Sequence, residues 1–296
     1  MIKFKAKKIL VPYDFSKNAD YALKHAAFIA SYNKGDVYLL YVKKKSELLD
    51  IFLPTLNLNK KGAFLDFVIQ KLDETIDKLK KEYGITAKKI VSEGNITDEI
   101  NQVAISDNMD LIMMGTRGKD SQSDLFFGSN SYRLITKTSI PVMTISTDPK
   151  IKGYDHVLLP IDLSSHSRQK VNYAIDMAKL FNAKITALGI YDEDEKSEKY
   201  KLEIINSQIE KLCEKKGVGF EGVIEKTKHR VQKTLAFSKR YKADLIITMT
   251  DQKIELNKSI LSTYDHELIN NSKVPVISIP PETSSDAAGS TAGLPF

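Results

Sequence analysis

The stretch ILVPYDFS at residues 9–16 returns near the middle of the chain as VLLPIDLS at residues 157–164, so that Asp14 and Asp162 are 148 residues apart. In each copy a short apolar run reaches a proline, and an aspartate and a serine follow. Such a run predicts a buried strand, and the serine predicts the N-cap of a helix. The chain is therefore predicted to contain the same strand–helix unit twice.

A second pair of stretches repeats later in each half. The sequence DLI at 110–112 returns at 244–246, and IPVMTI at 140–145 returns as VPVISI at 274–279, now at an offset of 134. The smaller offset predicts an insertion of 14 residues in the first half, which we place within 43–66. A polar, proline-containing segment near 147–150 predicts the junction between the halves.

The pattern inside one copy predicts its architecture. Apolar runs alternate with segments of helical periodicity, and the expected strands are 8–12, 37–42, 87–91, 111–114 and 141–145, with helices from Ser16 and at 64–83, 97–106 and 129–137. Alternating strands and helices indicate a parallel sheet covered on both faces. The predicted fold class is α/β, with two tandem doubly wound (Rossmann-like) domains, each a five-stranded, mainly parallel sheet. The domains are expected at 1–147 and 153–281, and 282–296 is expected to be a disordered tail.

Composition limits the classes of function. The 296 residues include 44 Lys and Arg against 38 Asp and Glu, a net charge of +6, but the lysines alternate with acidic residues as on solvated helix faces. Nucleic acid is therefore not an expected partner. No apolar run approaches the roughly 20 residues that span a membrane. The single cysteine, Cys213, excludes a disulfide within the chain, and a cytoplasmic location is expected.

Glycines follow the fourth expected strand at a specific spacing. Gly115 and Gly118 are separated by two residues, and nine further residues precede Gly128 and Ser129. Glycine at a strand end lets a ligand approach the backbone, and the free N–H groups of a following helix receive phosphate. Arg117 is a natural phosphate ligand, and Asn130 and Ser131 add polar groups at the helix start. The alternative is a loop that needs glycines only to turn.

Two residues at other strand ends would join this loop, since the carboxyl ends of parallel strands share one edge of the sheet. Asp14 is suited to accept hydrogen bonds from ribose hydroxyls, although it also fits a turn that begins a helix. That alternative explains why Asp162 persists in the second copy without the glycines. Val42 ends the second strand, where it would flank a base or simply belong to the core.

The strand-ending PYDFS at 12–16, the glycine loop and the closing strand at 141–145 together resemble the universal stress protein family. The resemblance covers both copies, so the chain resembles the tandem, two-domain form of the family. It implies the adenine-nucleotide-binding subclass, with ATP or AMP in the first domain. By position, the adenosine would be surrounded by Pro12, Tyr13, Asp14 and Val42. The phosphates would be held by Gly115, Arg117, Gly118, Gly128, Ser129, Asn130 and Ser131. Met114, at the end of the fourth expected strand, is a further expected cofactor-binding residue.

The second copy departs from this motif. Gly115, Gly118 and Gly128 correspond to Met249, Gln252 and Ser262, so that every glycine is replaced. We therefore expect no nucleotide in the second domain. In this family, paired domains commonly meet through their last strands, so 142–146 and 276–279 are expected to pair as an internal pseudo-dimer. A homodimer of whole chains is a further expectation.

Three classes of function stay open at this stage. The first is a nucleotide-dependent stress-response or signalling module with an unidentified protein partner, for which Phe126 and Phe127 are candidate contacts. The second is a slow ATP hydrolase or adenylyl-transfer protein, although no Walker lysine follows the glycines. Asp120 and Asp124 are its candidate Mg²⁺ ligands. The third is a nucleotide-independent interaction scaffold, with the insertion at 43–66 as a lid or dimer contact.

Overall fold

The computed structural model describes residues 3–43, 60–116, 129–146, 151, 153–164, 166–191, 196–250, 252–255, 258–261 and 263–281. The tail at 282–296 and most of the expected insertion at 43–66 lie outside these residues. So do Asp120, Asp124, Phe126 and Phe127.

Each half of the chain builds five parallel strands in the order 3-2-1-4-5, as expected for a doubly wound sheet. The strands of the first half are β1 (Lys8–Pro12), β2 (Asp36–Lys43), β3 (Thr86–Glu93), β4 (Leu111–Gly115) and β5 (Val142–Ile145). Those of the second half are β6 (His156–Ile161), β7 (Lys184–Tyr191), β8 (Phe220–Lys226), β9 (Leu245–Met249) and β12 (Val276–Ile279). The predicted fold class is confirmed.

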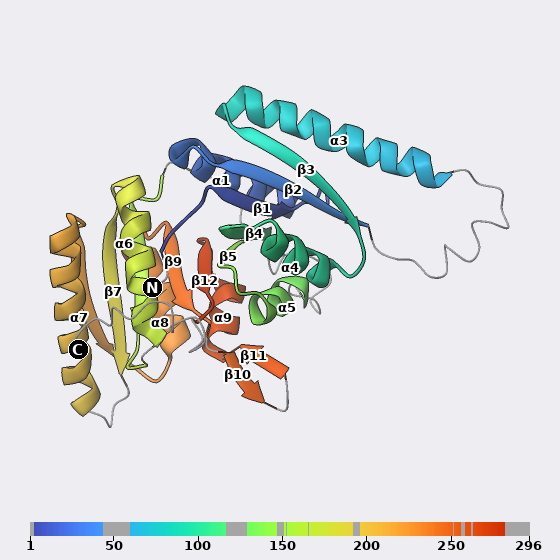
Figure 1. Cartoon of the computed structure of the whole chain (residues 1–296). Coiled ribbons are helices and arrows are strands. Elements are labelled where there is room, and N and C mark those ends of the chain that lie inside the picture. The colour runs from blue at the N-terminus through green and yellow to red at the C-terminus, as the bar shows by residue number, and fades with distance from the viewer. Residues whose placement is uncertain are drawn as a thin grey trace.

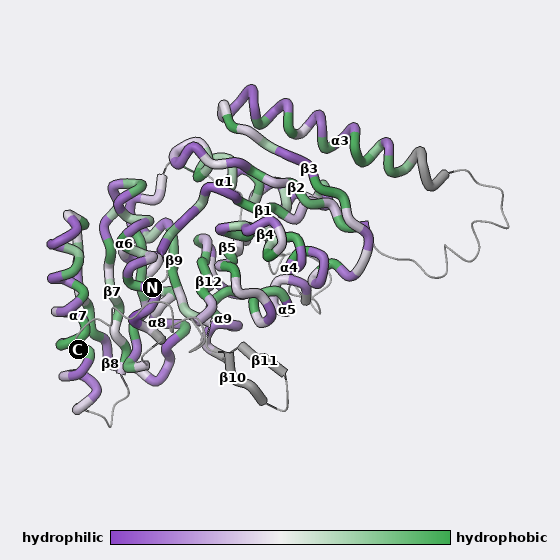
Figure 2. Tube along the Cα trace, viewed as in Figure 1, coloured by the Kyte–Doolittle hydropathy of each residue, from purple (hydrophilic) through white to green (hydrophobic). Residues whose placement is uncertain are grey.

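Helices cover both faces of the sheet (Figure 1). In the first half they are α1 (Lys17–Asn33), α3 (Lys60–Tyr83), α4 (Ile96–Ser106) and α5 (Ser129–Lys137). The matching helices of the second half are α6 (Gln169–Phe181), α7 (Lys196–Lys216), α8 (Arg230–Arg240) and α9 (Thr263–Asn271). Figure 2 shows α3 alternating between hydrophilic and hydrophobic residues along its length, the pattern of a helix with one buried face.

The two halves join into one sheet of ten strands. Strands β5 and β12 pair antiparallel, with Val276 opposite Thr144 and Ser278 opposite Val142, as expected for the last strands of the two domains. Two hydrophobic clusters, one on each face, run through both halves. On one of these faces the buried His25 of α1 forms a 2.5 Å hydrogen bond with the hydroxyl of Tyr154, which precedes β6.

The repeated DLI sequence has a structural role in both halves. The carboxylate of Asp110 accepts hydrogen bonds from the backbone N–H groups of Lys7 (2.9 Å) and Lys8 (3.0 Å) at the start of β1. Asp244 accepts the equivalent bonds from Asp155 and His156, both at 3.0 Å. These aspartates satisfy N–H groups at the beginning of the central strand of each domain, which explains their recurrence.

Two details differ from the sequence predictions. Helix α3 begins at Lys60 rather than at residue 64, and a hairpin of β10 (Gln252–Glu255) and β11 (Lys258–Leu261) occupies the place where the first domain has its glycine motif. The motif spacing predicted only the loss of the glycine loop, not a hairpin in its place. Among the described helices, none is both long and apolar enough to cross a membrane.

Candidate functional site

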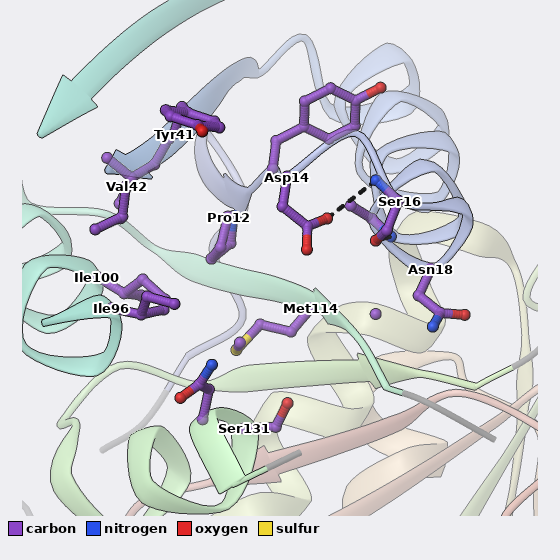
Figure 3. Close-up of a pocket in the computed structure, with 15 residues that line it drawn as sticks. Pro12, Asp14, Ser16, Asn18, Tyr41, Val42, Ile96, Ile100, Met114 and Ser131 are labelled. Atoms are coloured by element: carbon purple, nitrogen blue, oxygen red, sulfur yellow. Dashed lines mark hydrogen bonds between the residues drawn. The ribbon is translucent and has the colours of Figure 1, made fainter. Parts of the chain in front are cut away.

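A cavity of about 270 Å³ opens at the carboxyl ends of the strands of the first domain. Its lining comes from the ends of β1, β2 and β4 and from the starts of α1, α4 and α5 (Figure 3). This is the edge of the sheet where doubly wound folds bind ligands, because neighbouring chain crossovers leave the sheet on opposite faces there.

One side of the cavity is an apolar slot. Figure 3 shows Val42 of β2 on one side of the slot and Ile96 and Ile100 of α4 on the other, with Pro12 beside them. Leu40 of β2 also lines the cavity. Ile100 and Leu40 are almost fully buried, whereas Val42 is only partly covered. A flat aromatic group placed in this slot would lose its contact with water on both faces, which is favourable.

The other side of the cavity is polar and begins with a well-defined turn. The backbone N–H of Ser16 donates to Oδ1 of Asp14 at 3.0 Å, and the hydroxyl of Ser16 caps α1 by accepting from the N–H of Ala19 at 3.2 Å. Figure 3 shows the Asp14 carboxylate pointing into the cavity. Oδ2 makes no hydrogen bond with the described residues, so Asp14 keeps an acceptor for a ligand while it holds the turn.

Gly115 is required for a reason that the sequence did not reveal. A Cβ atom built on Gly115 would lie 2.0 Å from the carbonyl oxygen of Asn18, so the first turn of α1 packs directly on the end of β4. The glycine was expected only to let a ligand approach the backbone. A side chain at residue 115 would in addition displace the first turn of α1, which Ser16 caps. In the second domain Met249 takes this position, and α6 begins four residues later than α1 by alignment, after the 3-10 helix η2 (His166–Arg168).

Tyr13 lines the cavity, but its hydroxyl is engaged elsewhere. The hydroxyl donates to Oδ1 of Asp20 at 2.5 Å. Burial raises the pKa of Tyr13 well above its usual value, and the hydrogen bond and the charge of Asp20 raise it further. The phenol therefore stays neutral and fixes the β1–α1 turn. The ring contacts Phe15, whose backbone is left-handed with φ 63°, and Phe15 also contacts Tyr41 at the cavity rim.

Eight of the residues expected from the sequence lie around this one cavity: Pro12, Tyr13, Asp14, Val42, Met114, Gly115, Asn130 and Ser131. Arg117, Gly118 and Gly128 lie outside the described residues, and Ser129 is described only as the first residue of α5. Sequence reasoning missed the lining residues Ser16, Asn18, Ala19, Leu40, Tyr41, Ile96 and Ile100. The start of α4 was detectable, because that helix follows a strand ending at the same edge.

The metal question concerns the same edge. Within the described part of the chain, no group of three or more His, Cys, Asp or Glu side chains is placed to hold a metal ion. Both aspartates that the sequence offered for Mg²⁺ are outside that part.

Comparison with known proteins identifies the family. The model of the universal stress protein family matches residues 5–146 and again residues 153–280. This chain belongs to the universal stress protein family and contains two of its domains in tandem. It is similar to universal stress protein MJ0577 of Methanocaldococcus jannaschii, at 32% identity over 152 residues that cover 47% of this chain and 94% of that protein.

One further relative and one solved structure are also similar to this chain. Universal stress protein MJ0531 of the same organism is 31% identical over 150 residues, which cover 49% of this chain and 84% of the relative. The crystal structure of a universal stress protein from Archaeoglobus fulgidus superposes with a TM-score of 0.75 and 21% identity, and covers 94% of this chain and 99% of that one. The Archaeoglobus fulgidus structure extends the likeness in fold to both domains.

Proposed function

We propose that the first domain binds an adenine nucleotide, ATP or AMP, in the cavity at the ends of β1, β2 and β4. The chain would then act as a nucleotide-dependent stress-response module. The observation that carries this proposal is the junction of an apolar slot with a polar end at the start of a helix. The slot suits adenine, Asp14 suits the ribose hydroxyls, and the N-terminus of α5 with Asn130 and Ser131 suits phosphate.

The sequence beyond the described residues supports the same ligand. The segment after β4 carries Gly118 and Arg117, and Gly128 precedes α5 directly. A phosphate chain that leaves the cavity past Gly115 would reach this segment, where glycines permit close approach and the guanidinium supplies charge-assisted hydrogen bonds. A companion Mg²⁺ would sit on the phosphates, which supply most of its ligands in nucleotide sites.

The second domain is proposed not to bind nucleotide in this way. Three residues of the first cavity change character at matching positions: Ile96 becomes Arg230, Gly115 becomes Met249 and Ser131 becomes Asp265. A guanidinium replaces part of the apolar slot, and a carboxylate stands where the helix start would receive phosphate. Both changes oppose an adenine nucleotide, by desolvation and by like-charge repulsion.

The matched pair Asp14→Ala and Asp162→Ala tests the proposal. Each variant removes the same turn, because Ser16 and Ser164 donate to Asp14 and Asp162 at 3.0 and 2.8 Å. Both should therefore lose a similar stability, about 0.5–1.5 kcal/mol. Only Asp14→Ala should weaken binding of Mg-ATP in calorimetric titration, by about tenfold to a hundredfold for one charged hydrogen bond.

Equal ATP affinity in the two variants would reject Asp14 as a ligand. No measurable binding of ATP or AMP to the wild-type chain would reject the proposed function itself, and the protein would then be treated as an interaction scaffold.

A further inference from the structure

A second cavity, of about 230 Å³, opens at the matching edge of the second domain. It lies where a nucleotide would bind if this domain resembled the first, but its chemistry is different. Residues that are apolar or neutral in the first domain are replaced by charged ones: Lys170 stands for Ala22, Arg230 for Ile96 and Asp265 for Ser131. The cavity therefore keeps its position and loses the features of an adenine site.

Lys170 is the unusual residue of this cavity. Its side chain lines the space and is only 3% exposed, yet its ammonium forms no hydrogen bond and no ion pair within 4.0 Å with the described residues. It is also the second residue of α6, where the helix dipole disfavours a cation. Burial lowers the pKa of Lys170 to about 8, against the opposing effects of Asp162 and Asp265, so the amine is still mainly protonated at pH 7.

The acidic residues of the cavity already have partners. Oδ1 of Asp162 accepts from the backbone N–H of Ser164 at 2.8 Å, and Oδ1 of Asp265 accepts from the hydroxyl of Thr248 at 2.9 Å. Asp162 keeps an acceptor on its second oxygen, as Asp14 does, and the donors that line the cavity are Lys170 and Arg230. The ammonium of Lys170 lines the cavity without a protein partner among the described residues, so its three N–H donors are available to a ligand.

A second donor lines the same cavity from the opposite face of the sheet. Arg230 is the first residue of α8, and its guanidinium has no ion pair among the described residues. The N-cap residue of α8, His229, makes no side-chain bond to the helix, whereas Asn95 caps the matching helix α4. The start of α8 thus adds a guanidinium and uncapped N–H groups to the donors around this space.

We infer that the cavity of the second domain binds a small monocarboxylate, whose carboxylate accepts hydrogen bonds from Lys170 and Arg230 and whose short body packs on Ile190 and Met249. The volume limits the ligand to a small molecule. The two aspartates disfavour a dianion such as phosphate, because like charges at short range repel strongly in a poorly solvated site. A ligand with a single negative charge meets less of this repulsion, and its carboxylate can accept hydrogen bonds from both donors.

Methionine methyl groups offer a direct test, because Met114 lines the first cavity and Met249 lines the second. The full chain, labelled with ¹³C at the methionine methyl groups, would be titrated with butyrate, pyruvate and lactate at constant ionic strength in a buffer without carboxylate or phosphate. Met114→Leu and Met249→Leu assign the two signals. We expect a saturable shift of the Met249 signal and no shift of the Met114 signal.

The variant Lys170→Met removes the charge and keeps an unbranched side chain that is one atom shorter. It should lower the affinity for the carboxylate ligand by about tenfold or more, which is the effect of one charged hydrogen bond. Arg230→Gln should lower this affinity as well. Lys179→Met, an exposed lysine on the same helix, is the control and should leave binding unchanged. The chemical shifts of the other methionines report whether each variant is folded.

Three outcomes would overturn the inference. The first is the absence of a saturable shift of the Met249 signal with all three carboxylates. The second is an unchanged carboxylate affinity in folded Lys170→Met, and the third is tighter binding of inorganic phosphate than of butyrate. A failure here leaves the proposed ATP site untouched, because ATP binding to the first domain is measured separately, by calorimetric titration.

Discussion

The substitution Gly115→Ala tests how the end of β4 and the start of α1 together build the proposed nucleotide site. The added Cβ would lie 2.0 Å from the carbonyl oxygen of Asn18, whereas an ordinary contact between carbon and carbonyl oxygen is about 3.3 Å. The first turn of α1 must therefore retreat by roughly 1.3 Å, and Ser16 moves with it. Overpacking of this kind typically costs about 1–3 kcal/mol of folding stability.

Two assays follow this change. Chemical denaturation should show the loss of stability, and calorimetric titration should show weaker binding of Mg-ATP, because the turn from Asp14 to Ser16 borders the cavity. Gly84→Ala is the matched control. Gly84 has φ +66° with no atom within 4 Å of a Cβ, so alanine there costs about 1 kcal/mol through the backbone alone and should not change ATP affinity.

If Gly115→Ala had the stability and the ATP affinity of the wild type, the steric reasoning would be refuted. A loss of stability without any change in affinity would separate the packing of α1 from the ligand site.

Further predictions concern buried groups elsewhere. Burial lowers the pKa of His25 to about 4 from an ordinary value of 6.5, so between these pH values only the unfolded chain binds the extra proton. The free energy of unfolding should therefore fall by up to about 3 kcal/mol as the pH drops from 6.5 to 4. In pH-dependent denaturation, His25→Gln should flatten this part of the stability profile. Burial also raises the pKa of the Cys213 thiol to about 11, so less of the reactive thiolate is present in the folded protein. At pH 8 the folded protein should react with a thiol reagent about a hundredfold more slowly than the unfolded protein. Equal rates would contradict the burial of this residue.

Much of the fold follows from the sequence because its signals are local and occur twice. The run at residues 9–12 is apolar, ends at Pro12 and is repeated at 157–160, and the structure places β1 and β6 there. The pairing of β5 with β12 could also be expected, since each last strand would otherwise leave an exposed edge. The hairpin β10–β11 could not, because the loss of glycines does not specify what replaces them.

The candidate site was predictable only in part. Asp14 and Gly115 lie at strand ends and belong to a spaced motif, so their meeting at one edge of the sheet was foreseeable. Tyr41 and Ile100 carry no such signal, because partly or fully buried apolar residues on β2 and α4 look like ordinary core. Lys170 could not be predicted as a site residue for the opposite reason. In a lysine-rich chain, a lysine in a helix is expected to be a solvated surface residue, and only its burial distinguishes Lys170 from the others.

The central claim is one nucleotide site per chain, located in the first domain. Calorimetric titration of the nucleotide-stripped protein with Mg-ATP, beside Gly128→Val, tests it most directly. The account predicts a single site per chain in the wild type and its loss in the variant, where a β-branched side chain precedes the start of α5. Two equivalent sites per chain, or undiminished binding in Gly128→Val, would contradict it.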